Sequence, residues 1–159
     1  MIKENINDFF NDTQRIGPFL GIDLGEKRVG LSISDRTQSI ASNYATIEKK
    51  KFSLFSLDLQ AIIDKEIICG IVIGLPLNMD GSEGPKCQST RHFAKNFSTI
   101  VNLPITFWDE RLTTVAAERS LLSADLSRKK RKRVVDSVAA VLILQNLLDR
   151  LKNIQHGNT

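Results

Sequence analysis

The stretch Gly21–Asp35, GIDLGEKRVGLSISD, decides the fold that this sequence predicts. It begins inside an apolar run, Phe19–Ile22, which has the composition of a buried strand. After a turn framed by Gly25 and Gly30, apolar residues alternate with glycine and serine, as in a strand with two different faces. The stretch therefore predicts a β-hairpin with an acid, Asp23, in its first strand.

The position of Asp23 needs a physical reason. An unpaired carboxylate buried in an apolar strand costs several kcal/mol, so such an acid usually faces a cation, a set of hydrogen-bond donors or a metal ion. A turn-capping role is the structural alternative, because aspartate and glycine are both frequent in turns. This stretch alone favours neither reading.

The composition is that of one soluble domain. The chain has 159 residues, of which 42% are hydrophobic and 25% charged, enough for a hydrophobic core of its own. Its two cysteines and two histidines are far apart, so we expect neither a disulfide framework nor structural zinc. The N-terminus does not resemble a signal peptide, and no apolar run approaches the ~20 residues of a membrane span. We therefore expect a cytoplasmic protein without a membrane segment.

The net charge of +4 comes from one basic block, residues 128–133. The block consists of Arg128, Lys129, Lys130, Arg131, Lys132 and Arg133. Six of the 22 basic residues lie there, which leaves 16 against 18 acidic residues elsewhere. Adjacent like charges repel one another unless a polyanion lies against them, so the block is the best candidate for contact with a phosphate backbone. A solvated loop is the alternative reading.

Helical and strand patterns alternate after the hairpin, which predicts an α/β fold. In order, we expect a strand at 45–47, a helix at 52–63, a strand at 67–73, a helix at about 83–101, a strand at 105–108 and a helix at about 134–152. The loop after the second of these strands contains Asn78. We assign 19–152 to the domain, 1–18 to an N-terminal extension and 153–159 to a C-terminal tail.

Further acids lie near the ends of the later elements. Asp109 and Glu110 follow the last strand, and because neighbouring strand residues point to opposite faces, only one of them can share a site with Asp23. Periodicity does not choose between them. Asp136 lies in the first turns of the last helix, where it is either a structural acid stabilised by the helix dipole or a third site acid.

Taken together, these acids and the basic block suit divalent-metal phosphodiester chemistry. Carboxylate oxygens bind hard ions such as Mg²⁺ or Mn²⁺, and two such ions ~4 Å apart can activate a water and stabilise a leaving oxygen. Lysine and arginine would hold the polyanion.

Four motifs, GIDLGEKRVGLSISD, VIGLPLNMDGSEGP, FWDERLTT and SRKKRKRVVDSVAAVLIL, together resemble the YqgF-like (RuvX) family of pre-16S ribosomal RNA nucleases, also described as Holliday-junction-resolvase-like. The resemblance covers about residues 19–150. It implies a ribonuclease-H-like fold, in which helices flank a five-stranded mixed sheet whose first three strands are antiparallel. It also implies a cytoplasmic bacterial protein that acts in maturation of the 5′ end of 16S rRNA.

The resemblance also implies roles for single residues. The three family acids, expected to bind metal and act in catalysis, fall on Asp23, Glu110 and Asp136. Three further motif residues, expected to support the site or contact substrate, are Arg28, Asn78 and Arg111.

These observations lead to three hypotheses. The first is a metal-dependent nuclease on structured RNA, with Mg²⁺ or Mn²⁺ as cofactor. The second is a resolvase of four-way DNA junctions, which would need a dimer to place two sites on opposed strands. The third is a non-catalytic RNA-binding module in ribosome assembly, against which the acids argue, because without a metal they would repel a phosphate backbone. For the free protein we expect a monomer or a weak homodimer.

Overall fold

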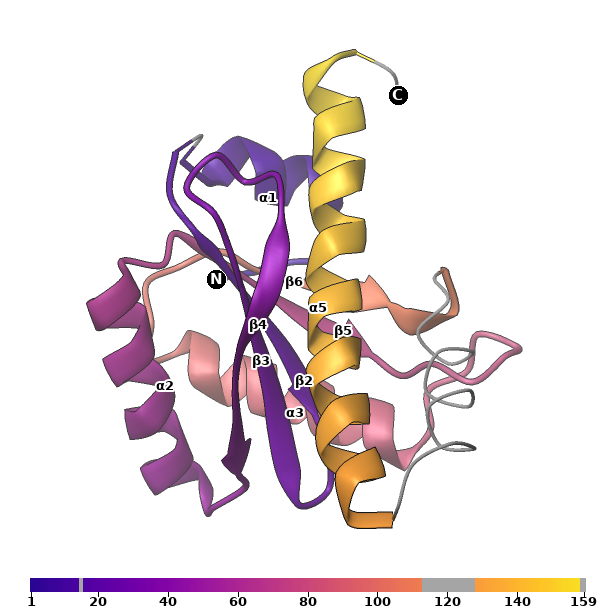
Figure 1. Cartoon of the computed structure of the whole chain (residues 1–159). Coiled ribbons are helices and arrows are strands. Elements are labelled where there is room, and N and C mark those ends of the chain that lie inside the picture. Colours follow the sequence, from indigo (N-terminus) through magenta and orange to yellow (C-terminus); the bar gives the residue numbers. More distant parts are fainter. Residues whose placement is uncertain (15, 113–127, 158–159) are drawn as a thin grey trace.

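The computed structural model describes residues 1–14, 16–112 and 128–157, without the side chains of 128–137. Strands and helices alternate along most of these residues (Figure 1). In chain order, the elements are β1 (Ile2–Lys3), α1 (Ile6–Asp12), β2 (Phe19–Leu24), β3 (Arg28–Ser34), β4 (Ala41–Glu48), α2 (Phe52–Glu66), β5 (Gly70–Leu75), α3 (Pro85–Ser98), β6 (Ile105–Asp109), the 3-10 turn η1 (Glu110–Leu112) and α5 (Arg128–Gln155).

The strands described form one mixed sheet in the order β1-β6-β5-β2-β3-β4. The pairs β2/β3 and β3/β4 are antiparallel, which confirms the predicted hairpin and its third strand, whereas β2/β5, β5/β6 and β1/β6 are parallel. The expected five strands are one too few, because Ile2 and Lys3 pair with Ile105 and Thr106 and add a strand at the edge.

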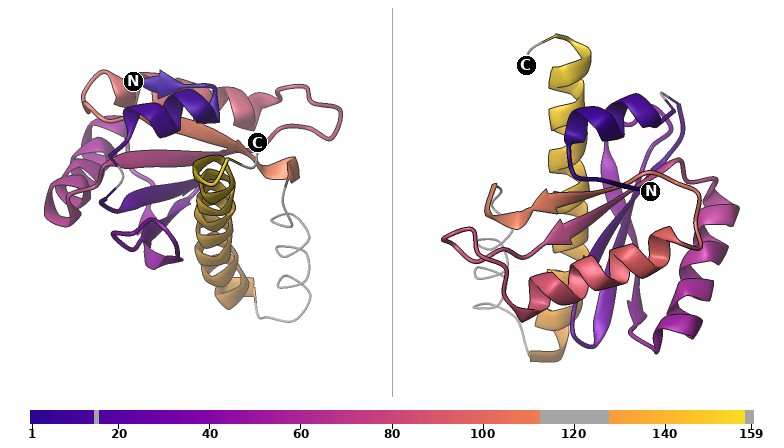
Figure 2. Two further views of the ribbon diagram at one scale, coloured as in Figure 1. Left: turned by 90° about the horizontal axis from the view of Figure 1, so that it is seen from above. Right: turned by 180° about the vertical axis from the view of Figure 1, so that it is seen from behind.

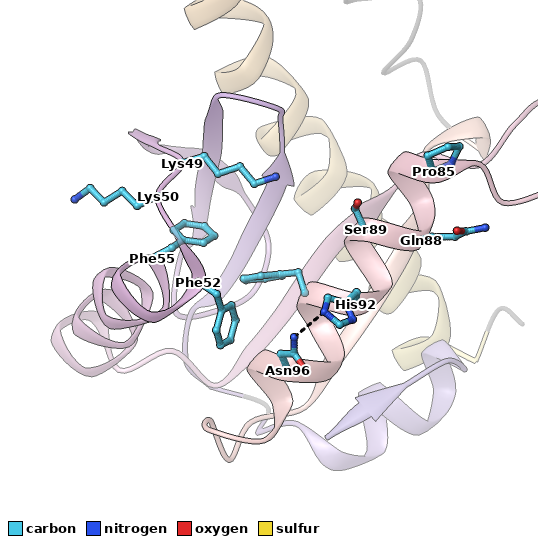
Figure 3. Close-up of a pocket in the computed structure, with 10 residues that line it drawn as sticks. Lys49, Lys50, Phe52, Phe55, Pro85, Gln88, Ser89, His92 and Asn96 are labelled. Carbon is cyan, nitrogen blue, oxygen red and sulfur yellow. Dashed lines mark hydrogen bonds between the residues drawn. The ribbon is translucent and has the colours of Figure 1, made fainter.

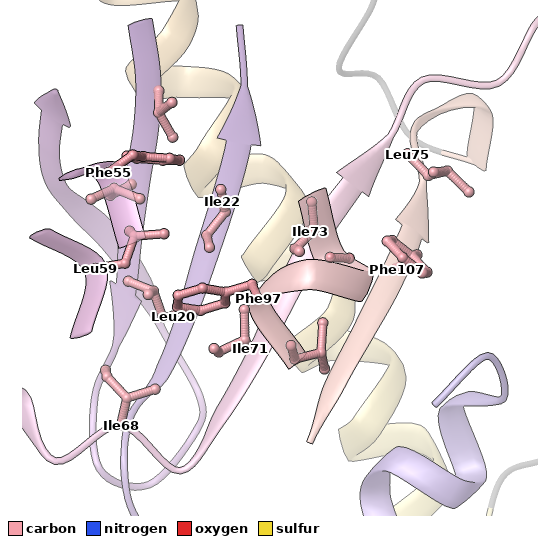
Figure 4. Close-up of a cluster of buried hydrophobic side chains, with 14 of the residues drawn as sticks. Leu20, Ile22, Phe55, Leu59, Ile68, Ile71, Ile73, Leu75, Phe97 and Phe107 are labelled. Carbon is pink, nitrogen blue, oxygen red and sulfur yellow. The ribbon is translucent and has the colours of Figure 1, made fainter. Parts of the chain in front are cut away.

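Helices cover both faces of the sheet (Figures 1 and 2). On one face, Phe55 and Leu59 of α2 and Phe97 of α3 pack on β2 residues Leu20 and Ile22 (Figure 4). The opposite face carries α5, which contacts β2, β3, β4 and β5 and whose apolar side forms a cluster with Val72 of β5 and Trp108 of β6. All six residues of β5 are buried, as the apolar run predicted for a strand covered on both sides. None of the described helices is long and apolar enough to cross a membrane.

The N-terminal residues are part of the domain's core. Phe9 in α1 is fully buried, and its ring lies 5.5 Å from that of Phe19 at the start of β2. The Met1 carbonyl accepts a hydrogen bond from Ile105 N–H, which continues the pairing of β1 with β6. The sequence set this segment apart because its short strand has no periodicity of its own and is stabilised by the edge of β6.

The last helix begins earlier than its apolar pattern indicated. It starts at Arg128 rather than 134, so the backbone of the basic block is helical, and it ends at Gln155 rather than at 152. The first three residues of the predicted C-terminal tail thus belong to α5. Arginine and lysine are good helix formers, so a helix can extend through a charged block that carries no apolar periodicity.

Candidate active site

Asp23 lies near the end of β2, on the face of the sheet that α5 covers. Its side chain is 5% exposed, and it pairs with Gly30 of β3 across the ladder. Residues two apart on a strand share a face, and at Gly21 an added Cβ would lie 3.2 Å from the Ala140 carbonyl of α5. The acid predicted from the hairpin is therefore a buried group under the last helix.

Glu110 reaches the same face from the other side of β5. It begins η1 directly after β6 and is 8% exposed. A Cβ added at Gly74 of β5 would lie 3.4 Å from the Glu110 carboxyl carbon and 2.4 Å from Ile143 of α5. Since β5 lies between β2 and β6, Asp23 and Glu110 approach the strand from its two sides, and Gly74 leaves the space for the second carboxyl group.

Asp109 lies on the opposite face of the sheet. Phe107, two residues earlier, packs in the core under α2 and α3, whereas Trp108 packs in the core under α5. Asp109 instead binds Arg111, whose Nη2 lies 2.7 Å from Oδ2. The hydrogen bonds from the Arg111 side chain are the main reason that the pKa of Asp109 is lowered. Of the two acids between which periodicity does not choose, Glu110 is thus the one that shares the face of Asp23.

Arg111 and Asn78 meet at the loop between β5 and α3. Arg111 Nη1 donates a hydrogen bond to the Met79 carbonyl at 3.4 Å, while its Nε and Nη2 hold Asp109. The Asn78 amide donates to Ser82 Oγ at 2.9 Å, so it stabilises its own loop. Arg111 therefore ties this loop to the end of β6, beside Glu110.

Arg28 starts β3 on the face that carries Asp23. It shares this face with Gly30 and with Ser32, whose hydroxyl donates to the Ala140 carbonyl of α5 at 2.6 Å. Its Nε lies 3.7 Å from Glu48 Oε1. Within the part of the chain that the structure describes, its buried Nη1 has no hydrogen-bond partner. Arg28 therefore places a cationic group on the acids' face of the sheet.

Asp136 belongs to α5, one helical turn before Ala140, where Ser32 holds the helix to the sheet. Its side chain, and those of the basic block from Arg128 to Arg133, lie outside the described residues. The structure thus places Asp23 and Glu110 on one face of the sheet, on either side of β5. The roles of the third acid and of the basic block, whose backbones lie in α5, remain predictions.

The two described carboxylates have the chemistry of a hard-metal site. Oxygen ligands suit Mg²⁺ and Mn²⁺, and buried carboxylates are stabilised by a bound cation. Among the side chains described, no group of three acids, cysteines or histidines gathers in a way that could hold a metal ion. Asp23 and Glu110 therefore fit part of such a site, and another ligand would have to come from elsewhere.

Sequence reasoning missed the residues that make room for the site. Gly21 and Gly74 allow α5 and Glu110 to lie against the sheet, and Ser32 fixes the helix. The available signal was a glycine inside each of two strands, which often marks a close approach of other groups. At Gly74 the signal is hidden, because the apolar run predicts a strand that ends at residue 73, whereas β5 continues to Leu75.

Comparison with known proteins identifies relatives of the chain. Residues 17–150 match a family profile described as "RuvX: Holliday junction resolvase". A Ruegeria pomeroyi protein named "Putative pre-16S rRNA nuclease" is 52% identical over 154 residues, which cover 97% of this chain and 100% of the relative. A protein of the same name from Rhodobacter capsulatus is 53% identical over 159 residues, covering 99% of this chain and 100% of the relative. Both alignments therefore include most of the N-terminal segment.

Solved structures with a similar fold include T. thermophilus RuvC in complex with a Holliday junction substrate. It aligns with a TM-score of 0.56 and 11% identity, covering 89% of this chain and 97% of the RuvC chain. Another Thermus thermophilus RuvC structure gives a TM-score of 0.51 at 10% identity, with the same coverage. At such low identity the likeness concerns the fold alone, and it confirms the ribonuclease-H-like architecture expected from the sequence.

Proposed function

The chain belongs to the RuvX family of YqgF-like proteins, and from this premise we propose that it is a divalent-metal-dependent nuclease for structured RNA. The substrate that we propose is the 5′ end of precursor 16S rRNA. The observation that carries the proposal is that two buried carboxylates, Asp23 and Glu110, lie on one face of the sheet, on either side of β5.

Asp23, Glu110 and Asp136 would hold Mg²⁺ or Mn²⁺ through their oxygens. When bound, such an ion activates a water molecule and stabilises the leaving oxygen of a phosphodiester. The protein's own contribution is to keep the first two carboxylates buried and oriented, because β2 and η1 fix their backbones and Gly74 leaves room for Glu110. Burial also keeps competing water away from the acids.

Basic groups near the acids would hold the substrate. Arg28 shares the face of Asp23, and the basic block at 128–133 forms the first turns of the helix that contains Asp136. Their charges would attract and orient a phosphate backbone.

The proposal is tested by offering two substrates to the protein. A precursor 16S rRNA with its 5′ extension and a four-way DNA junction are incubated with Mg²⁺ or Mn²⁺, with the native chain and with Asp23→Asn in parallel. We expect cleavage of the RNA by the native chain and its loss in the variant. Saturable thermal stabilisation by the metal, weaker in the variant, is the second expected result. If the native chain binds the RNA without cutting it, the binding-module hypothesis replaces this one.

Junction resolution is the second candidate, because the family profile carries that description. It would need a dimer with two active sites on opposed strands. Cleavage of the four-way junction, together with dimer formation on it, would favour this function. A monomer on the junction would count against it.

A further inference from the structure

A basic and aromatic groove lies between α2 and α3, on the face of the sheet opposite α5. The main hollow has a volume of about 700 Å³ (Figure 3). A second hollow of about 250 Å³ adjoins it toward the β2–β3 turn. The two share the lining residues Lys49, Pro85, Ser89 and Phe93. They therefore form one continuous surface that the proposed nuclease chemistry does not use.

The floor of the groove is aromatic and accessible. Phe52 opens α2 and is 37% exposed, with its ring 5.9 Å from that of Phe93 in a T-shaped contact. The Phe93 ring in turn stacks on Phe97 at 5.4 Å, which anchors it in the core. Phe52 thus presents part of a ring from a fixed position, as a stacking platform for a planar group would require.

The rim of the groove is polar, and its described residues include three lysines and one acid, Glu26, among neutral side chains. Lys49, Lys86 and His92 are exposed along it, and the His92 ring lies 3.2 Å from the Asn96 amide of the same helix (Figure 3). Lys86 is 3.9 Å from Glu26, and both side chains are at least 75% exposed. An ion pair at that exposure is weak, so the lysine can exchange its partner for a phosphate.

The groove begins at residues that directly follow Asp23 in the chain, on the opposite face of the sheet. Leu24, which directly follows Asp23, lines its second hollow together with Gly25. Lys49 N–H donates a hydrogen bond to the Lys27 carbonyl at 2.8 Å, which fixes the end of β4 to the β2–β3 turn. A nucleic-acid strand that runs from the acids around the β2–β3 turn would therefore enter the groove.

We propose that this groove binds an unpaired strand of nucleic acid, with a base stacked on Phe52 and phosphates held by Lys49 and Lys86. The inference rests on the proposed nuclease function and deepens it, since it makes a single-stranded flank part of the substrate. The ring of Phe52 can stack on an unpaired base, whereas the bases within a duplex are stacked on one another. The groove therefore distinguishes a single-stranded flank from a duplex. The combination of lysines with an aromatic floor favours a nucleic acid over an uncharged or basic protein segment.

Binding is tested separately from cleavage, in a chain that carries Asp23→Asn. A fluorescently labelled ten-nucleotide single-stranded RNA is titrated while its anisotropy is recorded at several salt concentrations. Adding Phe52→Ala is expected to weaken binding by roughly 5- to 150-fold, which corresponds to the loss of one base stacked on an aromatic side chain. The matched control is Leu57→Ala, since Leu57 lies on the same helix and is 61% exposed. This control should bind as the parent does.

The lysines are tested by their effect on salt dependence. Affinity falls with rising salt, and the double change Lys49→Ala and Lys86→Ala should make this dependence weaker. The magnitude of the slope of log affinity against log salt should fall by roughly 1 to 1.5, because two phosphate contacts are lost. The double change Lys65→Ala and Lys95→Ala removes the same charge from exposed positions outside the groove and should leave the slope nearly unchanged. Circular dichroism and Tm confirm that each variant is folded.

The outcomes separate the two proposals. Unchanged affinity in the Phe52 variant and unchanged slope in the groove lysine variant, or no binding of single-stranded RNA at all, would overturn the groove proposal and leave the nuclease proposal standing. Weakened binding in these variants, together with a native chain that cuts no substrate, would instead keep the groove and overturn the nuclease.

Discussion

Asp109 and Glu110 are neighbours in the sequence but lie on opposite faces of the sheet. Alternation along a strand predicts that they separate, yet it does not say which acid joins Asp23. The face is set by packing, since Phe107 lies under α2 and α3 whereas Trp108 lies under α5. Because both residues are aromatic, the sequence does not show which of them faces α5. The resemblance to a family points to Glu110, which is the acid on the face of Asp23, whereas residue patterns alone leave the choice open.

Arg111 is expected to position the loop beside Glu110. Arg111→Lys keeps the charge but loses the planar fork that binds Asp109 and the Met79 carbonyl together. We expect faster proteolysis of the 76–84 loop and a raised KM, with Tm within about 2 °C of the native value. Lys95→Arg, an exposed change on α3 away from the loop, serves as the control. Unchanged proteolysis at the loop would contradict this role.

Helix α5 is held against the sheet by hydrogen bonds at Ala140 and at Gln145. Ser32 Oγ donates to the Ala140 carbonyl at 2.6 Å, and a Cβ at Gly21 would lie 2.2 Å from that oxygen atom of Ser32. The sequence predicted this helix and its small residues, but it could not predict the height at which the helix crosses the strands. The point at which α5 crosses the strands depends on a hydrogen bond between residues that are 108 positions apart in the sequence.

Gly21→Ala is expected to displace α5 and destabilise the protein by about 1–3 kcal/mol, as overpacking of a core does. Cleavage should fall as well, since Asp136 is one turn away from the contact. Adding Ser32→Ala removes the nearest clashing atom and should restore part of the stability. The measurement is chemical denaturation of the single and double variants. A double variant less stable than Gly21→Ala alone would contradict this packing.

The turn between β3 and β4 is stabilised by the Asp35 carboxylate. It accepts hydrogen bonds from the backbone N–H groups of Ile40 at 2.9 Å and Ser39 at 2.8 Å, and one from the Thr37 hydroxyl. These bonds, that of Ile40 foremost, lower the pKa of Asp35 to about 2. A lowered pKa means that the carboxylate stabilises the fold above the unfolded value of ~3.9 and loses this effect as pH falls through about 2.

We therefore expect Asp35→Ala to lower Tm at neutral pH. The difference from the native chain should be constant between about pH 7 and 5 and should shrink from about pH 4 downward, since only the native chain has a carboxylate to protonate. Thermal unfolding followed by circular dichroism across this range measures it. A difference that grows on acidification would contradict the lowered pKa.

At the scale of the whole molecule, the sequence predicted the α/β class, the antiparallel hairpin and the buried strand β5, because each has a clear period or an unbroken apolar run. It did not predict that β1 and α1 complete the sheet edge and one end of the core. These elements are short, with two and seven residues, and they depend on contacts with β6 and with Phe19. Their signal is tertiary rather than local.

Phe9→Ala tests the role of the N-terminal segment. Truncation of a fully buried phenylalanine is expected to cost about 3–5 kcal/mol, whereas Ile16→Ala, at a side chain that is 66% exposed, should stay within about 0.5 kcal/mol of the native value. Denaturant titration measures both changes. Equal stability of the two variants would contradict a structural role for α1.

The most direct test of the active site compares the two neighbouring acids. Cleavage of the precursor RNA is measured under single-turnover conditions with saturating Mg²⁺ or Mn²⁺ for Glu110→Gln and Asp109→Asn. We predict a loss of at least about 100-fold for Glu110→Gln, since changes merely next to metal ligands cost 10- to 100-fold. For Asp109→Asn, on the far face, we predict a loss below about tenfold. A greater loss at Asp109 than at Glu110 would contradict the assignment of the site.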